Sequence, residues 1–192
     1  NVFSGKIQEG DIAFSGDQIA GIGEYEGKEV IDAEGRYAAP GFIDSHLHLE
    51  STLVTPAELV TVASRHGTTT FIVDPHESAN VSGLAGIDYI LDQTEDVKAN
   101  VYVMMPSCVP ATAIDDNGCT LTAEDMAPYL HNSRILGLGE VMDSISVVQG
   151  EKSMHDKLEL FEGRIRDGHA PFLEEGDLQA YAMAGIATDH EC

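Results

Sequence analysis

The sequence predicts an α/β protein whose main part, residues 39–192, is an incomplete (β/α)8 barrel of the TIM type with about six of its eight strands present. Residues 1–38 precede it as part of a small β-sandwich domain. Two observations favour the barrel. Strand and helix patterns alternate at intervals of about thirty residues, which indicates a parallel sheet. The predicted strands also end in polar or metal-competent side chains. In a barrel the carboxyl ends of all strands meet at one mouth, where the active site lies, whereas the site of a doubly wound sheet would use fewer strand ends.

The first forty residues show strand and turn signals without helical periodicity. Short alternating runs at residues 7–9, 11–14 and 18–22 are separated by Gly10, by Ser15-Gly16-Asp17 and by further glycines. They predict a small β-meander that ends near Ala38. Because the chain opens at Asn1 in the middle of this unit, we expect that the natural protein begins earlier. Because a complete barrel has eight strands and six are predicted here, we expect two more after Cys192.

From Pro40 onward the pattern repeats strand, polar loop and helix. The predicted strands are residues 41–49, 69–74, 100–105, 135–140, 164–169 and 186–190. Thr55 followed by Pro56 and Glu58 is a typical helix start, and Gly67 ends that helix. Four further helices are predicted from apolar stripes: Leu84, Ile87 and Leu91; Thr122, Met126 and Leu130; Leu158, Phe161 and Ile165; Leu178 and Tyr181.

Composition excludes several classes of function. With 33 acidic and 10 basic residues the formal charge is -23, which repels nucleic acids and anionic membranes. No apolar run is long enough to span a bilayer, and the given residues do not open with the basic-then-apolar pattern of a signal peptide. The three cysteines form no Cys-x-x-Cys pair. We therefore expect a cytoplasmic protein with no nucleic acid or membrane partner. The unpaired strand edges of an incomplete barrel could pair with a second copy, so a homo-oligomer is compatible with the sequence.

The first barrel strand carries a motif suited to metal binding. In a strand over residues 41–49, His46 and His48 lie on the same face, because side chains alternate with a period of two. Two imidazoles that point the same way can bind one divalent ion. For this motif alone, a pair of ordinary histidines beside a loop is an equally good interpretation.

Later strand ends supply further ligands. His46, His48, Glu140, His169 and His190 together offer four imidazoles and one carboxylate. This set can hold two divalent ions with the carboxylate between them. A lone histidine is more often structural, but placement on successive strand ends weakens that interpretation. The remaining predicted structural or surface histidines, which lack this placement, are His66, His131 and His155.

Several strings in the chain resemble one enzyme family. Pro40-Gly41-Phe42-Ile43-Asp44-Ser45-His46-Leu47-His48 resembles the first strand of the amidohydrolase superfamily. Within that superfamily, the adenine deaminase family of bacteria and archaea is similar in five strings that occur in the same order: His48-Leu49-Glu50-Ser51, Val73-Asp74-Pro75-His76-Glu77, Ser107-Cys108-Val109-Pro110, Gly137-Leu138-Gly139-Glu140-Val141-Met142-Asp143 and Asp167-Gly168-His169-Ala170-Pro171. The resemblance covers the whole chain and corresponds to the N-terminal portion of the family.

The resemblance implies a ligand assignment. His46 and His48 would bind one metal ion, His169 and His190 the second, and Glu140 would bridge both. The family's metal is Mn²⁺ or Fe²⁺, and this ligand set does not separate these ions from Zn²⁺. Related dihydroorotases and hydantoinases bridge their metals with a carboxylated lysine on strand four. No lysine occurs between Lys98 and Lys152, which disfavours those cyclic-amide hydrolases.

The implied reaction is metal-dependent hydrolytic deamination of adenine to hypoxanthine and ammonia, as in purine salvage, with a small-molecule purine as substrate. Glu140 and Glu77 are the catalytic candidates, and Ser107 and Cys108 are candidate substrate-pocket residues. Asp143 and Glu191 could also serve in the pocket. Glu77, Asp143 and Glu191 are equally suited to cap helices or to orient a ligand histidine. Two alternatives are another dinuclear amidohydrolase, such as an amino-sugar deacetylase or a different aminopurine hydrolase, and an inactive fragment that binds metal.

Overall fold

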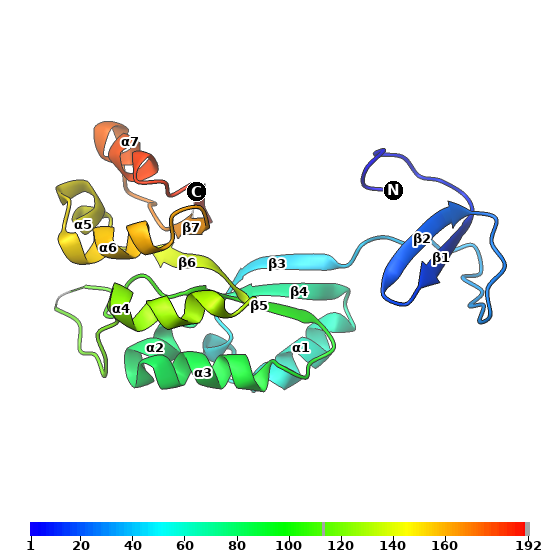
Figure 1. The fold of residues 1–192 in the computed structure, drawn as a ribbon, viewed down its shortest axis with the longest axis horizontal. Coiled ribbons are helices and arrows are strands. Elements are labelled where there is room, and N and C mark those ends of the chain that lie inside the picture. The colour runs from blue at the N-terminus through cyan, green and yellow to red at the C-terminus, as the bar shows by residue number, and fades with distance from the viewer. Residues whose placement is uncertain (113, 191–192) are drawn as a thin grey trace. The chain divides into compact units, whose positions relative to one another are not determined.

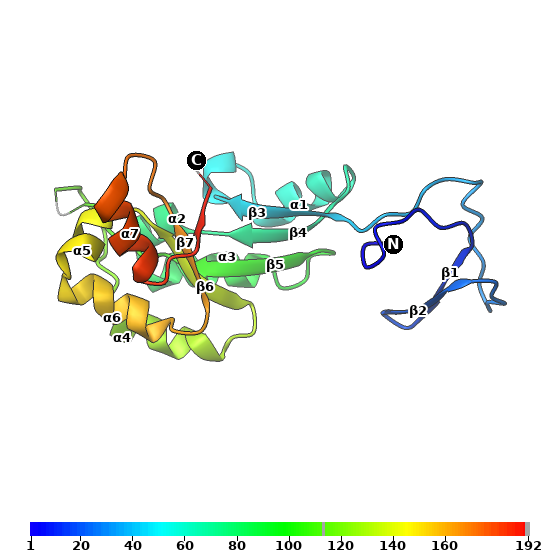
Figure 2. The same ribbon diagram turned by 90° about the horizontal axis from the view of Figure 1, so that it is seen from above.

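A six-stranded parallel sheet organises the larger part of the chain in the computed structural model, which describes residues 1–112 and 114–190 (Figure 1). Its strands are β3 (Phe42–Leu47), β4 (Thr68–Val73), β5 (Asn100–Met105), β6 (Ile135–Val141), β7 (Ile165–Gly168) and β8 (Thr188–Asp189). They follow one another in the sheet in sequence order, and each neighbouring pair is parallel. The strands curl into part of a barrel, which confirms the predicted fold class (Figure 2).

Helices fill the connections between these strands. They are α1 (Pro56–Ser64), α2 (His76–Ser82), α3 (Leu84–Gln93), α4 (Ala123–Met126), α5 (Ser144–Gln149), α6 (Lys152–Leu160) and α7 (Glu175–Met183), with short 3-10 turns η1 (Glu50–Thr52) and η2 (Ala127–His131). In Figure 1, α1, α2 and α3 lie on one side of β3, β4 and β5. Covering helices of this kind bury the strand face that they contact and give a parallel sheet its core.

Burial alternates along the central strands. In β4, Phe71 and Val73 are buried while Ile72 between them is only half-buried. In β5, Val101 and Val103 are likewise buried on either side of the half-buried Tyr102. Since successive strand residues point to opposite faces, the helices cover the face that carries the more deeply buried residues.

Local signals explain where two helices begin. The Thr55 hydroxyl accepts a hydrogen bond from the Glu58 N–H at 3.4 Å, with Pro56 in the first turn of α1, as the sequence predicts. Thr122 caps α4 with a complete capping box, in which Thr122 and Asp125 each bond the backbone N–H of the other. These caps satisfy amide groups that would otherwise lack a partner.

Two helix predictions need correction. Ile165 does not extend the helical stripe of Leu158 and Phe161, because α6 ends at Leu160 and Ile165 begins β7. Gly163, with a φ of 78°, lies between them in the left-handed region that favours glycine. The sequence interpretation also missed α2 and α5, which are short and contain one buried residue each, Ala79 and Val147.

The N-terminal unit, Asn1–Pro40, contains one antiparallel hairpin. Its strands are β1 (Asp11–Ser15) and β2 (Gln18–Gly23), joined through Gly16 at a φ of 64°. This fits the expected small β domain, but the predicted strand at residues 7–9 is absent from the described structure. There the chain folds back on Asn1, whose side chain donates to Gln8 Oε1 at 2.7 Å. The larger unit comprises Gly41–Cys192.

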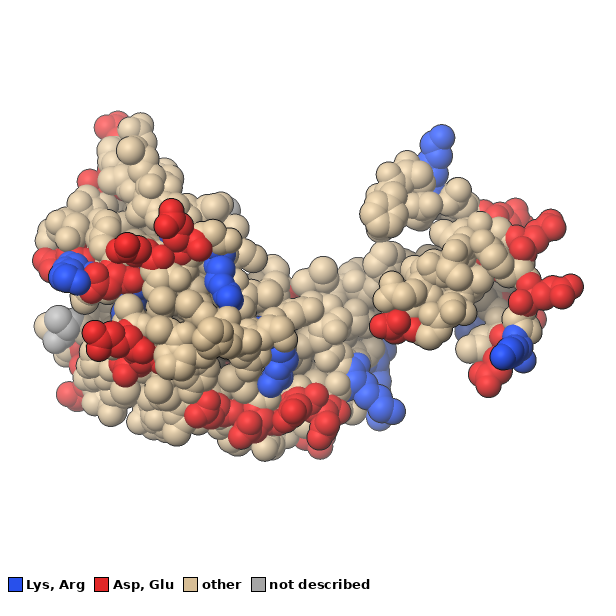
Figure 3. Space-filling model, in the orientation of Figure 1, with Lys and Arg blue, Asp and Glu red and all other residues tan. Residues whose placement is uncertain are grey.

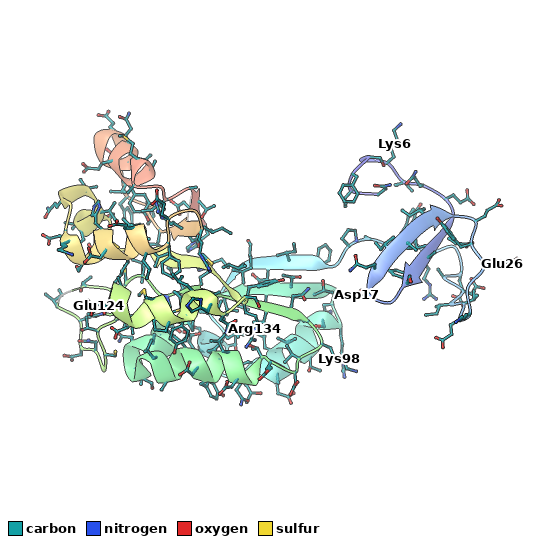
Figure 4. All side chains as sticks on the ribbon, viewed as in Figure 1. Lys6, Asp17, Glu26, Lys98, Glu124 and Arg134 are labelled. Atoms are coloured by element: carbon teal, nitrogen blue, oxygen red, sulfur yellow. The ribbon has the colours of Figure 1, made fainter. Side chains whose placement is uncertain are left out.

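Arg134, labelled in Figure 4, fixes the entry to β6. Its guanidinium donates to Thr94 Oγ1 at 2.8 Å and to the Leu91 carbonyl at 2.6 Å, so it joins the residue before β6 to the end of α3. A planar guanidinium with several donors suits such a double contact. The contact helps to set where β6 and its terminal residues lie.

Acidic side chains spread over the surface in Figure 3, in line with the formal charge of -23. Among the residues that the structure describes, no helix combines the length and the apolar character needed to cross a membrane.

Candidate metal centre

Glu140, near the end of β6, is the centre of a cluster of imidazoles. Its side chain is only 4% exposed. The five surrounding histidines are His46, His48, His76, His169 and His190. They come from β3, the loop after β3, the start of α2, and the regions around the ends of β7 and β8. The structure therefore brings together all five residues of the predicted ligand set, and adds His76.

The two carboxylate oxygens of Glu140 divide these imidazoles into two groups. Oε1 lies 3.1 Å from His76 Nδ1, 3.2 Å from His48 Nε2 and 3.9 Å from His46 Nε2. Oε2 lies 3.0 Å from His169 Nδ1 and 3.3 Å from His190 Nε2. Each oxygen thus faces its own set of ring nitrogens, as a carboxylate between two cations would.

The main chain of Glu140 is held by side chains from the two preceding strand ends. Asp74, the residue after β4, accepts a hydrogen bond from the Glu140 N–H at 2.8 Å. Ser107, which follows β5, donates its hydroxyl to the Glu140 carbonyl at 2.5 Å. Both side chains are buried, with 1% of each residue exposed. The backbone from which the central carboxylate projects is therefore held at both its N–H and its carbonyl.

The charges in the cluster shift one another's protonation. Burial alone would raise the pKa of Glu140, but hydrogen bonds from His48 and His76 hold it well below its usual range. The hydrogen bond to Glu140 raises the pKa of His48 from 6.5 to about 9. Burial raises the pKa of Asp74 to about 7. The Glu140 carboxylate thus raises the pKa of the neighbouring imidazoles His48 and His76 by hydrogen bonding to them, although burial opposes this shift.

The predicted pocket residues occupy different surroundings. Ser107 and Cys108 are buried, and the Cys108 thiol is bonded by the Ser107 hydroxyl and the Asp143 N–H. Glu77 is exposed and accepts a hydrogen bond from the Ser51 hydroxyl at 2.5 Å. Within the described residues, no contact joins the Glu77 carboxylate to the histidine cluster. Asp143 caps α5 through Ser146, and Glu191 lies outside the described residues.

The three histidines assigned to structure or surface lie apart from the cluster. His66 and His131 are exposed. His155 contacts the Val147 carbonyl at 2.9 Å. None of the three belongs to the groups of potential metal ligands in the described part of the chain.

Three neighbours of the cluster escaped the sequence interpretation as site residues: Asp74, His76 and Asp167. Asp74 and His76 follow directly after β4, so the strand-end rule that selected the other ligands applied to them as well. Asp167 lies inside β7, where that rule does not reach. Its Oδ2 atom contacts His46 Nδ1 at 3.3 Å.

Comparison with known proteins identifies the family of the chain. A profile of the amidohydrolase family matches residues 37–192. The chain belongs to the amidohydrolase family. Three similar curated proteins, each named adenine deaminase, come from Desulfitobacterium hafniense (58% identity over 192 residues), Clostridium acetobutylicum (48% over 194) and Geobacillus kaustophilus (48% over 194). Each alignment covers all of this chain and 34% of the relative, so the chain spans about a third of their length.

Amidohydrolases use divalent metal ions, and the cluster has the chemistry to hold them. Ligand atoms of His46, His48 and Glu140 lie within 4.8 Å of one another, and so do those of Glu140, His169 and His190. The His169 Nδ1 atom is buried and makes no hydrogen bond among the described residues, although Glu140 Oε2 is near. A buried imidazole nitrogen directed at a carboxylate without a hydrogen bond fits a coordinate bond to an ion between them.

Gly139 is expected to tolerate no side chain. A methyl group added there would overlap the Asp74 carboxylate, which holds the Glu140 N–H. We expect Gly139→Ala to lower the free energy of unfolding by about 1–3 kcal/mol, the usual cost of overpacking a buried site. Denaturant unfolding measures the loss. Gly176→Ala, in α7 with open space around it, is the matched control and should be neutral or slightly stabilising. Equal effects of the two substitutions would contradict this packing argument.

The raised pKa of His48 predicts how the metal-free protein responds to pH. Because its pKa is about 9 when folded and 6.5 otherwise, protonated His48 stabilises the fold fully below pH 6.5. That contribution, up to about 3 kcal/mol, is lost as the pH rises through about 9. Asp74 acts in the same direction at lower pH, between 3.8 and about 7. Urea unfolding of chelator-treated protein at pH 6 and pH 9.5 tests this, and His48→Gln should flatten the difference.

Proposed function

We propose that the protein carrying this chain hydrolyses adenine to hypoxanthine and ammonia with two divalent metal ions. The observation that carries the proposal is the position of Glu140, whose two oxygens face separate groups of imidazoles. The similarity to proteins named adenine deaminase, at up to 58% identity over the whole chain, supports adenine as the substrate. The net reaction consumes one water and exchanges the amino group of the purine for an oxygen.

In this proposal His46 and His48 would hold one ion together with Glu140, and His169 and His190 would hold the other, also with Glu140. Two ions bound there would lower the pKa of a water so that it can act as nucleophile near neutral pH. The ions are Mn²⁺ or Fe²⁺, with Zn²⁺ compatible with the same ligands. We place the reaction in purine salvage in the cytoplasm, in keeping with the sequence-based expectation.

Proton transfer at the purine requires a further group within reach. We propose His76 for this role ahead of Glu77. The His76 ring lies beside Glu140 with Nδ1 at 3.1 Å from Oε1, and 19% of its side chain is exposed. Glu77 is the next residue, but its carboxylate accepts the Ser51 hydroxyl. The polar atoms of Ser107 and Cys108 contact Glu140, Asp143 and each other. We therefore propose that these two residues support the site rather than contact the substrate.

The test uses the protein expressed from its complete reading frame and loaded with Mn²⁺. Loss of adenine and release of ammonia are followed beside a panel of other aminopurines and N-acetylated amino sugars. We expect adenine to be the preferred substrate. Turnover of another compound without turnover of adenine would replace the proposal with a different amidohydrolase activity. Metal binding without turnover of any compound would favour a binding role.

A further inference from the structure

Two histidines from opposite ends of the sheet stack on each other. His46 belongs to β3 and His190 follows β8, which are the two outermost strands in the sheet order. Their ring centroids are 3.6 Å apart with an angle of 16° between the ring planes. Each ring turns Nε2 toward Glu140, His46 toward Oε1 and His190 toward Oε2. The stacked pair therefore contains one imidazole from each of the two groups around Glu140.

Asp167 lies against the opposite edges of both rings. Its Oδ2 atom makes a hydrogen bond with His46 Nδ1 at 3.3 Å and lies at ion-pair distance, 3.4 Å, from His190 Nδ1. Its other oxygen, Oδ1, accepts hydrogen bonds from the Thr188 hydroxyl at 2.6 Å and from the Gly168 N–H at 3.0 Å. The side chain is 14% exposed. A carboxylate has two acceptor positions on each oxygen, so one side chain can serve all four neighbours.

This contact selects the tautomer of the two imidazoles. A ring whose Nδ1–H faces a carboxylate keeps its Nε2 lone pair free for a metal ion. The Thr188 hydroxyl and the Gly168 N–H both bond to Oδ1, which leaves Oδ2 to face the two ring edges. Oδ2 points at the ring edges that lie away from Glu140, which suits orienting the rings better than binding the same ions.

We propose that Asp167 is a positioning residue shared by both metal positions, where it fixes the ring and tautomer of His46 in one and of His190 in the other. The inference rests on the proposed function for the assignment of these histidines as ligands. An asparagine cannot replace the carboxylate, since its NH2 group would face either the ring Nδ1–H groups or the Gly168 N–H and the Thr188 hydroxyl. A change at this one side chain should therefore weaken both ions together.

The experiment compares Asp167→Asn with wild type in the protein from its complete reading frame. Stepwise binding of Mn²⁺ is measured by calorimetry and metal analysis. We expect the affinity to fall at both positions, by roughly 10- to 100-fold at each. Asp88→Asn is the control, because it removes the same charge from an exposed residue that contacts Tyr129. A loss confined to one ion, or unchanged affinity at both, would overturn the inference.

A second readout does not depend on affinity. Histidine labelled with ¹⁵N in the Zn²⁺-loaded protein reports which ring nitrogen carries the proton. Wild type should show Nδ1–H for His46 and His190, and Asp167→Asn should lose this state at both. If that variant does not fold, Thr188→Val takes its place, because it removes only the 2.6 Å bond to Oδ1 and should give a smaller change of the same kind. No change in either nitrogen spectrum contradicts the proposal.

The outcomes separate this inference from the proposed function. If wild type binds two Mn²⁺ ions and leaves adenine unchanged, the function fails while the Asp167 comparison is still decided by binding. If wild type deaminates adenine and Asp167→Asn binds both ions normally, the positioning role alone fails. A wild-type protein that binds fewer than two ions would contradict both.

Discussion

Replacing Glu140 by glutamine is expected to lower the rate of adenine deamination about a thousandfold or more and to leave fewer than two bound ions per chain. Stabilisation of transition-state charge by a metal ion contributes several kcal/mol, and each 1.36 kcal/mol is a factor of ten in rate. Glutamine keeps the shape of the side chain but carries no charge, and its NH2 group must face one of the two groups of imidazoles. Because both ions would share this one carboxylate in the proposed arrangement, both should be affected.

Metal analysis and adenine turnover of Glu140→Gln test the prediction. Glu159→Gln is the matched control, since Glu159 is exposed on α6 and belongs to none of the groups of potential metal ligands among the described residues. It should keep both ions and full activity. If Glu140→Gln kept two ions and near-normal turnover, Glu140 would not be the bridge, and the assignment of ligands around it would have to be rebuilt.

Much of the fold follows from the sequence because each βα unit carries local signals. The strand Asn100–Met105 was predicted with both of its bounds, and the other barrel strands within a few residues. Strand ends in a barrel meet at one mouth, so residues far apart in the sequence could be predicted to lie together. His46 and Glu140 are an example, with ring nitrogen and carboxylate oxygen 3.9 Å apart.

The other contacts of the site depend on where side chains point, and the hydrophobic periodicity and the motif spacing of a sequence do not determine this. Ser107 lies at a strand end, as predicted, but its hydroxyl bonds the main chain of Glu140. His76 begins a helix without an apolar stripe, so periodicity did not indicate that helix, and only the position of His76 after β4 marked the residue. The approach of Asp167 to His46, 121 residues away in sequence, arises from the curl of the sheet. At residues 7–9, alternation predicted a strand, but within the described N-terminal unit, Asn1–Pro40, only β1 and β2 pair.

Removal of the metal ions should abolish adenine deamination and destabilise the fold in one step. An ion present at a hundred times its dissociation constant stabilises the native state by about 2.7 kcal/mol, so two such ions together contribute roughly 5 kcal/mol. For a domain of 150–250 residues each kcal/mol shifts the melting temperature by roughly 2–4 °C, which predicts a fall of about 10 °C or more on chelation. Calorimetry with and without chelator measures the shift.

The same experiment distinguishes a bridging site from incidental binding. Glu140→Gln should melt at nearly the same temperature with and without chelator, whereas Asp88→Asn should respond as wild type does. Mn²⁺, Fe²⁺ and Zn²⁺ are then added back separately to the chelated protein. Activity and melting temperature should recover together for the native ion, because under the proposed function His48, His169 and Glu140 would hold the ions on which both depend. Recovery of stability without activity would mean that an ion fills the site in a form that does not support the reaction, and unchanged melting on chelation would contradict metal binding at Glu140.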